Sequence, residues 1–166
     1  MSIEKKYLFD TDLNTLFSAL SSTKYLGHKY DETGIKRHEF LKDETTADQQ
    51  IIDVRIWAST NMPKIAQKII PAEVALVGTV IWFLGDGKEK KGRYITRFEK
   101  FPVEIVTEVV LKEEGKGKSS YKTITTAKCS IPMIGEHIAP FIEKDTSKML
   151  DQEEPMLKEY LKTLTA

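Results

Sequence analysis

The sequence predicts an α+β fold in which about seven antiparallel strands curve around one long terminal helix. Over residues 135–164, apolar side chains recur at intervals of three, four and seven, which is the spacing of one stripe on an α-helix. A helix of that length spans roughly 45 Å at 1.5 Å per residue, and the longest strand-like segments span roughly 33–43 Å at 3.3 Å per residue. Because the two lengths match, we expect the helix to lie along the sheet and a cavity to remain between them.

The beginning of the chain predicts one strand followed by one or two short helices. Aromatic residues alternate with charged ones over residues 3–9, as in a half-buried strand. Thr11 or Asp12 can cap a helix whose apolar stripe covers residues 13–20. Residues 23–31 fit either a second short helix or an irregular turn.

Two strands then flank a polar turn, and the second of them has the clearest pattern in the chain. Strand character resumes over residues 34–42 and again over residues 49–59. In the second segment Asp53, Arg55 and Trp57 alternate with apolar residues, so one face should be buried. The residues expected on the buried face are Ile52, Val54, Ile56 and Ala58.

The second half of the chain predicts a meander of four long strands. A short apolar segment between Pro63 and Pro71 interrupts the strands and fits one or two helical turns. The connections after it are short enough for hairpins, so consecutive strands should pair antiparallel. These strands are expected at residues 73–84, 92–100, 103–113 and 118–131.

Glycine and proline define the ends and the interior of the terminal helix. Gly135 should mark the junction with the last strand, because Pro132 cannot donate to a strand ladder and glycine permits a sharp change of direction. Pro155 removes a backbone donor, and its ring clashes with the carbonyl of Asp151. We therefore expect a bend or a break within one turn of Pro155.

Charge and cysteine content exclude several classes of protein. The 25 basic side chains equal the 25 acidic ones, so no overall charge attracts nucleic acid or anionic lipid. The single cysteine, Cys129, excludes an internal disulfide and favours a reducing compartment. No apolar run of membrane-spanning length and no signal-peptide pattern is found. We expect a cytoplasmic protein with one domain over residues 1–166, without a nucleic-acid partner or an integral membrane segment, and leave the oligomeric state open.

The sequence contains no motif for catalysis, metal binding or nucleotide binding. His28, His38 and His137 fall in no metal-ligand pattern, and one cysteine cannot build a structural zinc site, so we expect no metal. The serines lack the setting of a hydrolase nucleophile, and the glycines lack the spacing of a phosphate loop, so we expect no cofactor. Among the histidines, His38 lies on a predicted strand from which it could reach the cavity.

Apolar and aromatic side chains are the main candidates for a binding surface. The inner wall of the sheet would meet apolar residues of the terminal helix, and methionines adapt to varied apolar ligands. The predicted ligand-binding residues are Ile52, Val54, Ile56, Trp82, Tyr94, Phe98, Tyr121, Met133, Phe141 and Met149. The proline-bounded segment, with Met62, Ile65 and Ile69, is predicted to form a lid over the cavity mouth.

The order of these elements resembles the helix-grip fold shared by START lipid-transfer domains, pollen-allergen-like proteins and polyketide cyclases. A narrower resemblance is to the bacterial DUF2505 family of unknown function, in which a strand ends in a "V-P-hydrophobic-hydrophobic-G" turn before a helix with an early glutamate. Residues 9–20 and 62–70 resemble two further elements of that family. The resemblance implies a fold and a cavity but no reaction. The residues that match the turn are Ile131, Pro132, Met133, Ile134, Gly135 and Glu136.

Three functions fit this sequence. The first is non-enzymatic binding of a hydrophobic small molecule, such as a lipid or a sterol-like or polyketide-like compound, in the cavity between sheet and helix. The second is a cyclase- or hydratase-type enzyme in which His38, Arg37 or Tyr94 supplies acid–base chemistry in the same pocket. The third is an interaction protein with a filled cavity. The charged residues mostly alternate outward, which favours binding.

Overall fold

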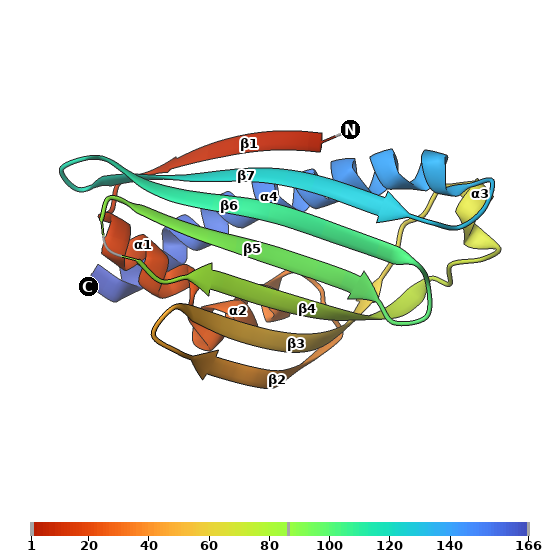
Figure 1. Ribbon diagram of the computed structural model, residues 1–166, viewed down its shortest axis with the longest axis horizontal. Helices are drawn as coiled ribbons and strands as arrows, with labels where there is room; N and C mark the ends of the chain where they lie inside the picture. Colours follow the sequence, from red (N-terminus) through yellow and green to blue (C-terminus); the bar gives the residue numbers. More distant parts are fainter. Residues whose placement is uncertain (1, 86, 166) are drawn as a thin grey trace.

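The computed structural model describes residues 2–85 and 87–165, and its strands form one antiparallel sheet (Figure 1). The seven strands are ordered β1-β7-β6-β5-β4-β3-β2 across the sheet. This arrangement confirms the predicted α+β class with a curved sheet and a long C-terminal helix. The elements are β1 (Ser2–Phe9), α1 (Leu13–Leu20), α2 (Thr23–Glu32), β2 (Arg37–Thr45), β3 (Gln49–Ser59), α3 (Lys64–Gln67), β4 (Glu73–Phe83), β5 (Glu89–Phe98), β6 (Val103–Gly115), β7 (Lys118–Cys129) and α4 (Gly135–Thr165).

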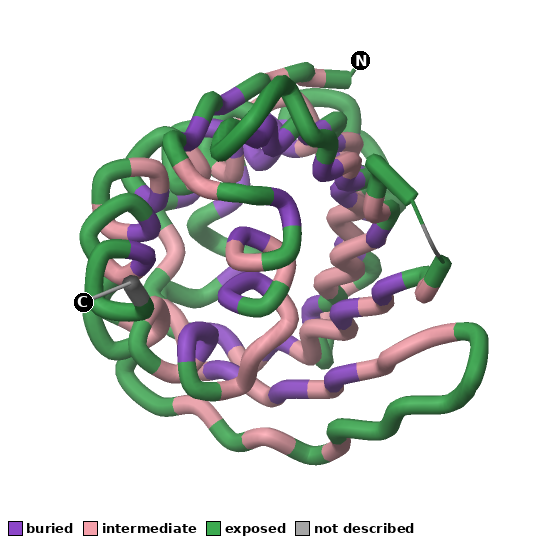
Figure 2. Tube along the Cα trace, turned by 90° about the vertical axis from the view of Figure 1, so that its left-hand side faces the viewer, coloured by how far each residue is buried: buried purple, intermediate pink, exposed green. Residues whose placement is uncertain are grey.

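The helices cover different parts of one face of the sheet. α4 packs mainly on β7 and β1, which form one edge, and α2 packs on β2 at the opposite edge. α1 lies between them and contacts β6, β7 and α4. The end view in Figure 2 shows strands and helices arranged around a common interior. None of the helices in the described residues is long and apolar enough to cross a membrane.

The first two helices follow from local capping residues. Asp12 caps α1 by accepting a hydrogen bond from the backbone N–H of Thr15 at 2.8 Å, and Ser22 caps α2 by accepting from Lys24 N–H at 3.2 Å. The segment that fitted either a helix or an irregular turn is therefore a helix. Tyr25 and Leu26 are the buried residues of α2.

Buried apolar residues alternate with less buried polar residues along β3, so its two faces are distinct. Ile52 and Val54 are buried on the concave face, as predicted, and Arg55 pairs with Glu99 on the outer face at 2.6 Å. On the neighbouring strands Gly92 makes room for Trp82, since a Cβ at Gly92 would lie 2.6 Å from the indole ring. The absence of a side chain there is what lets a buried tryptophan lie flat on the sheet.

The junction between β7 and α4 confirms the prediction for Gly135. The helix begins at Gly135, and a Cβ there would lie 2.1 Å from the carbonyl oxygen of Cys129. The predicted break at Pro155 is wrong, because α4 continues through Pro140 and Pro155 to Thr165. Pro155 lies on an exposed side of the helix, so water can solvate the carbonyl oxygen that loses its helical partner.

The core consists of two apolar clusters at opposite ends of the sheet. The first joins α1, α2 and the end of α4 to the sheet, with Trp82, Tyr121 and Leu157 among its members. The second lies at the α3 end and includes Val54, Phe98 and Ile138. The predicted strand boundaries hold within three residues; β2 begins at Arg37 instead of residue 34, and β5 begins at Glu89 instead of residue 92.

Candidate functional site

Three residues near the centre of the concave face are part-exposed. Gly78 and Thr96 share this face with Val54, because Val54 pairs with Gly78 and Gly78 pairs with Thr96; Tyr94, two residues from Thr96, lies on it as well. Gly78, Tyr94 and Thr96 are part-exposed, whereas Val54 is only 1% exposed. α4 packs mainly on β7 and β1, and its residues Ile142 and Leu157 belong to the core clusters that also contain residues of the central strands.

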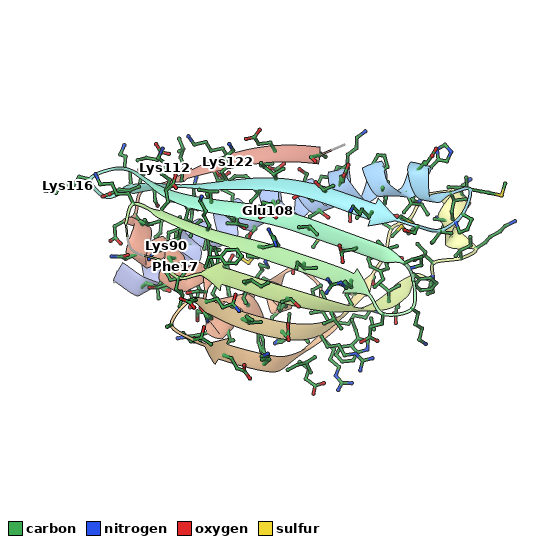
Figure 3. The ribbon with its side chains drawn as sticks, viewed as in Figure 1. Phe17, Lys90, Glu108, Lys112, Lys116 and Lys122 are labelled. Carbon is green, nitrogen blue, oxygen red and sulfur yellow. The ribbon has the colours of Figure 1, made fainter. Side chains whose placement is uncertain are left out.

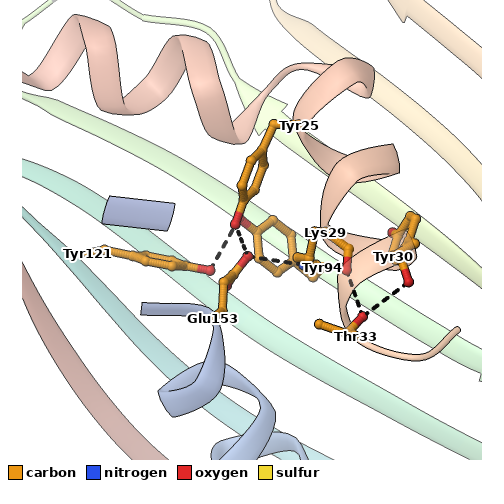
Figure 4. A network of polar contacts seen from close by, with 7 residues as sticks. All are labelled: Tyr25, Lys29, Tyr30, Thr33, Tyr94, Tyr121 and Glu153. Atoms are coloured by element: carbon orange, nitrogen blue, oxygen red, sulfur yellow. Dashed lines mark hydrogen bonds and ion pairs between the residues drawn. The ribbon is translucent and has the colours of Figure 1, made fainter. Parts of the chain in front are cut away.

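A polar cluster joins α2 and α4 on the concave side of the sheet. Glu153 of α4 is 4% exposed and accepts a hydrogen bond from the Tyr25 hydroxyl of α2 at 2.7 Å (Figure 4). The Lys29 ammonium, one turn further along α2, lies 3.3 Å from the same carboxylate oxygen. A buried carboxylate needs such partners, since an unpaired buried charge costs several kcal/mol. We call Tyr25, Lys29 and Glu153 the Glu153 cluster.

Tyrosine and tryptophan side chains of the sheet lie next to the Glu153 cluster. The Tyr121 hydroxyl of β7 donates to the Tyr94 hydroxyl of β5 at 3.4 Å. Trp82 packs edge-on against Tyr94 with ring centroids 5.9 Å apart, and its buried indole N–H has no hydrogen-bond partner in the described part of the chain. The interior therefore combines aromatic surface with hydroxyl and N–H groups that can orient a ligand.

Burial controls protonation in this region. Burial, followed by the charge of Glu153, raises the pKa of Tyr25 far above its ordinary value, and burial likewise raises the pKa of Tyr94 and Tyr121. For Lys29, burial lowers the pKa, but the neighbouring Glu153 and Tyr30 together outweigh it and the pKa is raised overall. At neutral pH the site therefore presents neutral phenols and a charged lysine.

A second buried carboxylate fixes α4 to the sheet. Glu143 is 1% exposed, and one of its oxygens accepts a hydrogen bond from the backbone N–H of Ala127 at 2.9 Å. Ala127 lies one residue beyond Thr126, which pairs with Ser2, the first described residue of β1. Among the described residues, the other Glu143 oxygen and the hydroxyls of Ser147 and Thr123 are buried without a hydrogen-bond partner. The α4–β7 contact is thus unusually polar for a helix packed on a sheet.

The structure brings most of the predicted lining residues to the concave side. Trp82, Tyr94 and Tyr121 are in mutual proximity, and Phe141 is part-exposed on α4. Met149 is 47% exposed, and its spacing of seven from Ile142 places it on the same side of α4. The remaining strand residues, which are buried, are Ile52, Val54, Ile56 and Phe98.

Met133 does not line the interior, which corrects its assignment. Its side chain is 95% exposed in the turn between β7 and α4, where the backbone has a positive φ of 70°. In the proline-bounded segment, Met62 is 8% exposed and faces the second core cluster, but Ile65 and Ile69 are 50% and 45% exposed. The interior face of α3 is formed by Ala66 in place of these two isoleucines.

The residues named for acid–base chemistry lie in different places. Tyr94 lies beside the Glu153 cluster. Burial raises the pKa of Tyr94, and the charge of Glu153 raises it further. His38 lies on the edge strand β2. Its Nδ1 is 3.7 Å from the Oδ1 of Asp31, and its ring lies against that of Tyr30. Arg37 stacks on Trp57 at 4.4 Å, outside the interior. No cluster of histidine, cysteine and acidic residues that could hold a metal occurs among the described residues.

The sequence interpretation missed the residues of the Glu153 cluster and Glu143. A signal existed in the terminal helix, where Leu150 packs against the first core cluster between Ile142 and Leu157. The fully buried positions of that stretch are taken by polar residues, Glu143, Ser147 and Glu153. A polar gap inside an apolar stripe indicates either a polar partner or a ligand group in the interior.

Two hollows in the surface lie away from the Glu153 cluster. One, at the end of β3 and β4, is lined by Trp57, Glu73 and Glu99, among others. The other lies beside α3, lined by Thr60, Met62 and Gln67, among others. Neither contains a buried polar side chain, so the Glu153 cluster remains the candidate site.

Solved structures share this fold at low sequence identity. The protein TTHA0849 from Thermus thermophilus is 11% identical with a TM-score of 0.68, and the match covers 100% of both chains. ZhuI aromatase/cyclase from Streptomyces sp. R1128 is 8% identical with a TM-score of 0.66, over 100% of this chain and 96% of that one. A START superfamily protein from Mycobacterium smegmatis is 12% identical with a TM-score of 0.59, over 98% of both chains. At these identities the likeness establishes the fold alone.

Family membership comes from the sequence. No curated protein matches the chain. The model of the family described as "Protein of unknown function (DUF2505)" matches residues 6–161. The chain therefore belongs to the DUF2505 family, with the helix-grip fold of START-like proteins.

Proposed function

We propose that this protein binds an amphipathic small molecule between the concave face of the sheet and α4 without transforming it. The observation that carries the proposal is the Glu153 cluster, a buried carboxylate held by Tyr25 and Lys29 beside the aromatic side chains of the first core cluster. Apolar walls would contribute about 25 cal/mol per Å² of ligand surface buried, and the polar groups would orient the ligand.

The chemistry of the interior favours a ligand with a hydroxyl or carbonyl group on an apolar body. Tyr94 has a neutral hydroxyl that accepts from Tyr121 and keeps its own proton to donate, and the indole N–H of Trp82 has no partner in the described residues. Such groups serve a carbonyl or hydroxyl oxygen, as in sterol-like or polyketide-like compounds, better than a purely hydrocarbon lipid. The fold that this chain shares with an aromatase/cyclase supports the same class of ligand. The proposed lining consists of Ile52, Val54, Ile56, Trp82, Tyr94, Phe98, Tyr121 and Phe141, with Met149 at the rim.

The alternative is an enzyme of cyclase or hydratase type that uses the same site. The observation that favours it is the contact of Glu153 with a phenol and an ammonium group, at 2.7 and 3.3 Å. A buried carboxylate with two proton-bearing neighbours can transfer a proton to or from a bound carbonyl compound. In that case Glu153→Gln would abolish turnover while leaving binding of the substrate largely intact.

Dye binding tests the proposal, with a matched pair of variants. The native protein should bind an environment-sensitive apolar dye with saturable affinity. Thr96→Phe adds volume on the part-exposed concave face and should abolish that binding at an unchanged melting temperature. Ile95→Phe makes a similar change on the outer face of the same strand and should leave dye binding unaffected.

A filled interior would give a different pattern. Overpacking a closed core costs about 1–3 kcal/mol. If Thr96→Phe destabilises the protein by that amount and the native protein binds no dye, the chain is an interaction protein with a filled cavity.

A further inference from the structure

The end of the molecule that carries α3 exposes an apolar tip. Met133 is 95% exposed, and Ile65 and Ile69 are 50% and 45% exposed. α3 and the turn between β7 and α4 lie next to each other at that end (Figure 1). Their inner residues, including Ala66 and Ile131, belong to the same core cluster. We call Ile65, Ile69 and Met133 the apolar tip.

The exposure of the apolar tip follows from the backbone. The inner face of α3 is already apolar, with Ala66 and Ile70 0% and 1% exposed, so the segment has apolar side chains on both sides. Met133 adopts a φ of 70°, which an L-residue with a side chain rarely takes, and which holds a long thioether in water. Apolar groups gathered at one exposed site indicate an interaction surface.

Two lysines flank the apolar tip. Lys64 precedes Ile65 and Lys68 precedes Ile69, and both are exposed. Neither forms an ion pair within the described residues, whereas Lys36 pairs with Glu73 and Lys5 pairs with Asp151. Exposed apolar side chains next to unpaired lysines match the interface of an anionic bilayer, where the acyl boundary meets negative headgroups.

We propose that the apolar tip docks this protein on the surface of an anionic phospholipid membrane. Ile65, Ile69 and Met133 would enter the headgroup region while Lys64 and Lys68 contact lipid phosphates. A second copy of the chain fits the surface less well, because a symmetric contact would bring the same lysines of the partner opposite these. The overall charge is balanced, with 25 basic and 25 acidic residues, so the attraction proposed here is local and comes from Lys64 and Lys68.

Docking here would place the membrane beside the interior. The other side of the segment, through Met62 and Ala66, packs in the cluster that contains Val54 and Ile56. An apolar ligand could then pass from the bilayer past α3 without crossing water. The docking surface does not depend on a ligand in the interior, so the two proposals fail separately.

Sedimentation with lipid vesicles tests this proposal. The purified protein should bind vesicles of phosphatidylcholine mixed with phosphatidylserine more tightly than vesicles of phosphatidylcholine alone. Lys64→Gln/Lys68→Gln should weaken binding to the mixed vesicles by about fivefold per lysine and abolish the preference for them. Ile65→Ser/Ile69→Ser, and separately Met133→Ser, should weaken binding to both kinds of vesicle.

Matched controls lie elsewhere on the chain. Leu8→Ser and Leu41→Ser remove leucines that are 60% and 53% exposed on β1 and β2, and should not change vesicle binding. Lys112→Gln/Lys116→Gln removes two lysines near the β6–β7 hairpin, at the end of the molecule opposite α3, and should have little effect (Figure 3). Dye binding should persist in the tip variants, which separates this test from that of the interior.

Three results would overturn the proposal. The first is a native protein that sediments with neither kind of vesicle, and the second is a loss of binding in the control variants as large as in the tip variants. The third is a native dimer in light scattering that Ile65→Ser/Ile69→Ser converts to a monomer, which would assign the apolar tip to self-association.

Discussion

Glu153 and the tyrosines around it make the stability of this protein sensitive to alkaline pH. Tyr7, Tyr25, Tyr30, Tyr94 and Tyr121 all have raised pKa values, with burial as the largest cause. A group whose pKa is raised by folding stabilises the folded state below its unfolded pKa, about 10 for tyrosine, and loses that contribution as the pH rises toward the folded value. Lys29 adds a contribution of the same sign.

We therefore expect the free energy of unfolding to fall as the pH rises above about 10. Tyrosinate absorbance, followed together with circular dichroism, should show most of the six tyrosines ionising only as the protein unfolds. A smooth titration of all six near their ordinary pKa, with the fold intact, would contradict the burial described for this cluster.

The contact of Glu143 with β7 predicts a second effect at the residue scale. Glu143→Ala leaves the N–H of Ala127 without a partner and should lower the free energy of unfolding by about 1–3 kcal/mol. Glu143→Gln keeps an acceptor oxygen and should cost less. Urea unfolding measures both, and equal losses for the two variants would mean that the charge, not the hydrogen bond, matters at this position.

At the scale of elements, the entry into α4 depends on one glycine. Gly135→Ala would place a Cβ 2.1 Å from the carbonyl oxygen of Cys129, so the turn must shift, at a cost of about 1–3 kcal/mol or more. Gly85→Ala is the matched control, because a Cβ there meets no atom within 4 Å. If thermal unfolding shows the same small change for both, the turn is less constrained than its geometry indicates.

The same elements explain what the sequence could and could not predict. Alternation placed Ile52 and Val54 correctly, and backbone chemistry placed Gly135, because both depend on neighbours in the sequence. The Glu153 cluster was missed since Tyr25 lies 128 residues away from Glu153, and no local pattern links the two. The break expected at Pro155 does not occur, because its exposed side of the helix leaves the freed carbonyl oxygen to water.

At the scale of the whole molecule, the fold has three distinct regions. The β1 and β7 edge holds α4 through Glu143 and through Tyr7, whose hydroxyl donates to Asp151 at 2.8 Å. The central strands leave a solvent-accessible concave face at Tyr94 and Thr96. The α3 end carries the apolar tip.

Native mass spectrometry of gently purified protein tests the central claim, that the interior binds an amphipathic small molecule, most directly. We predict a species heavier than the bare chain by the mass of one small molecule, released on collisional activation, and its absence from Thr96→Phe but not from Ile95→Phe. A bare chain alone in the native protein, together with no saturable dye binding, would contradict the claim and indicate a filled interior.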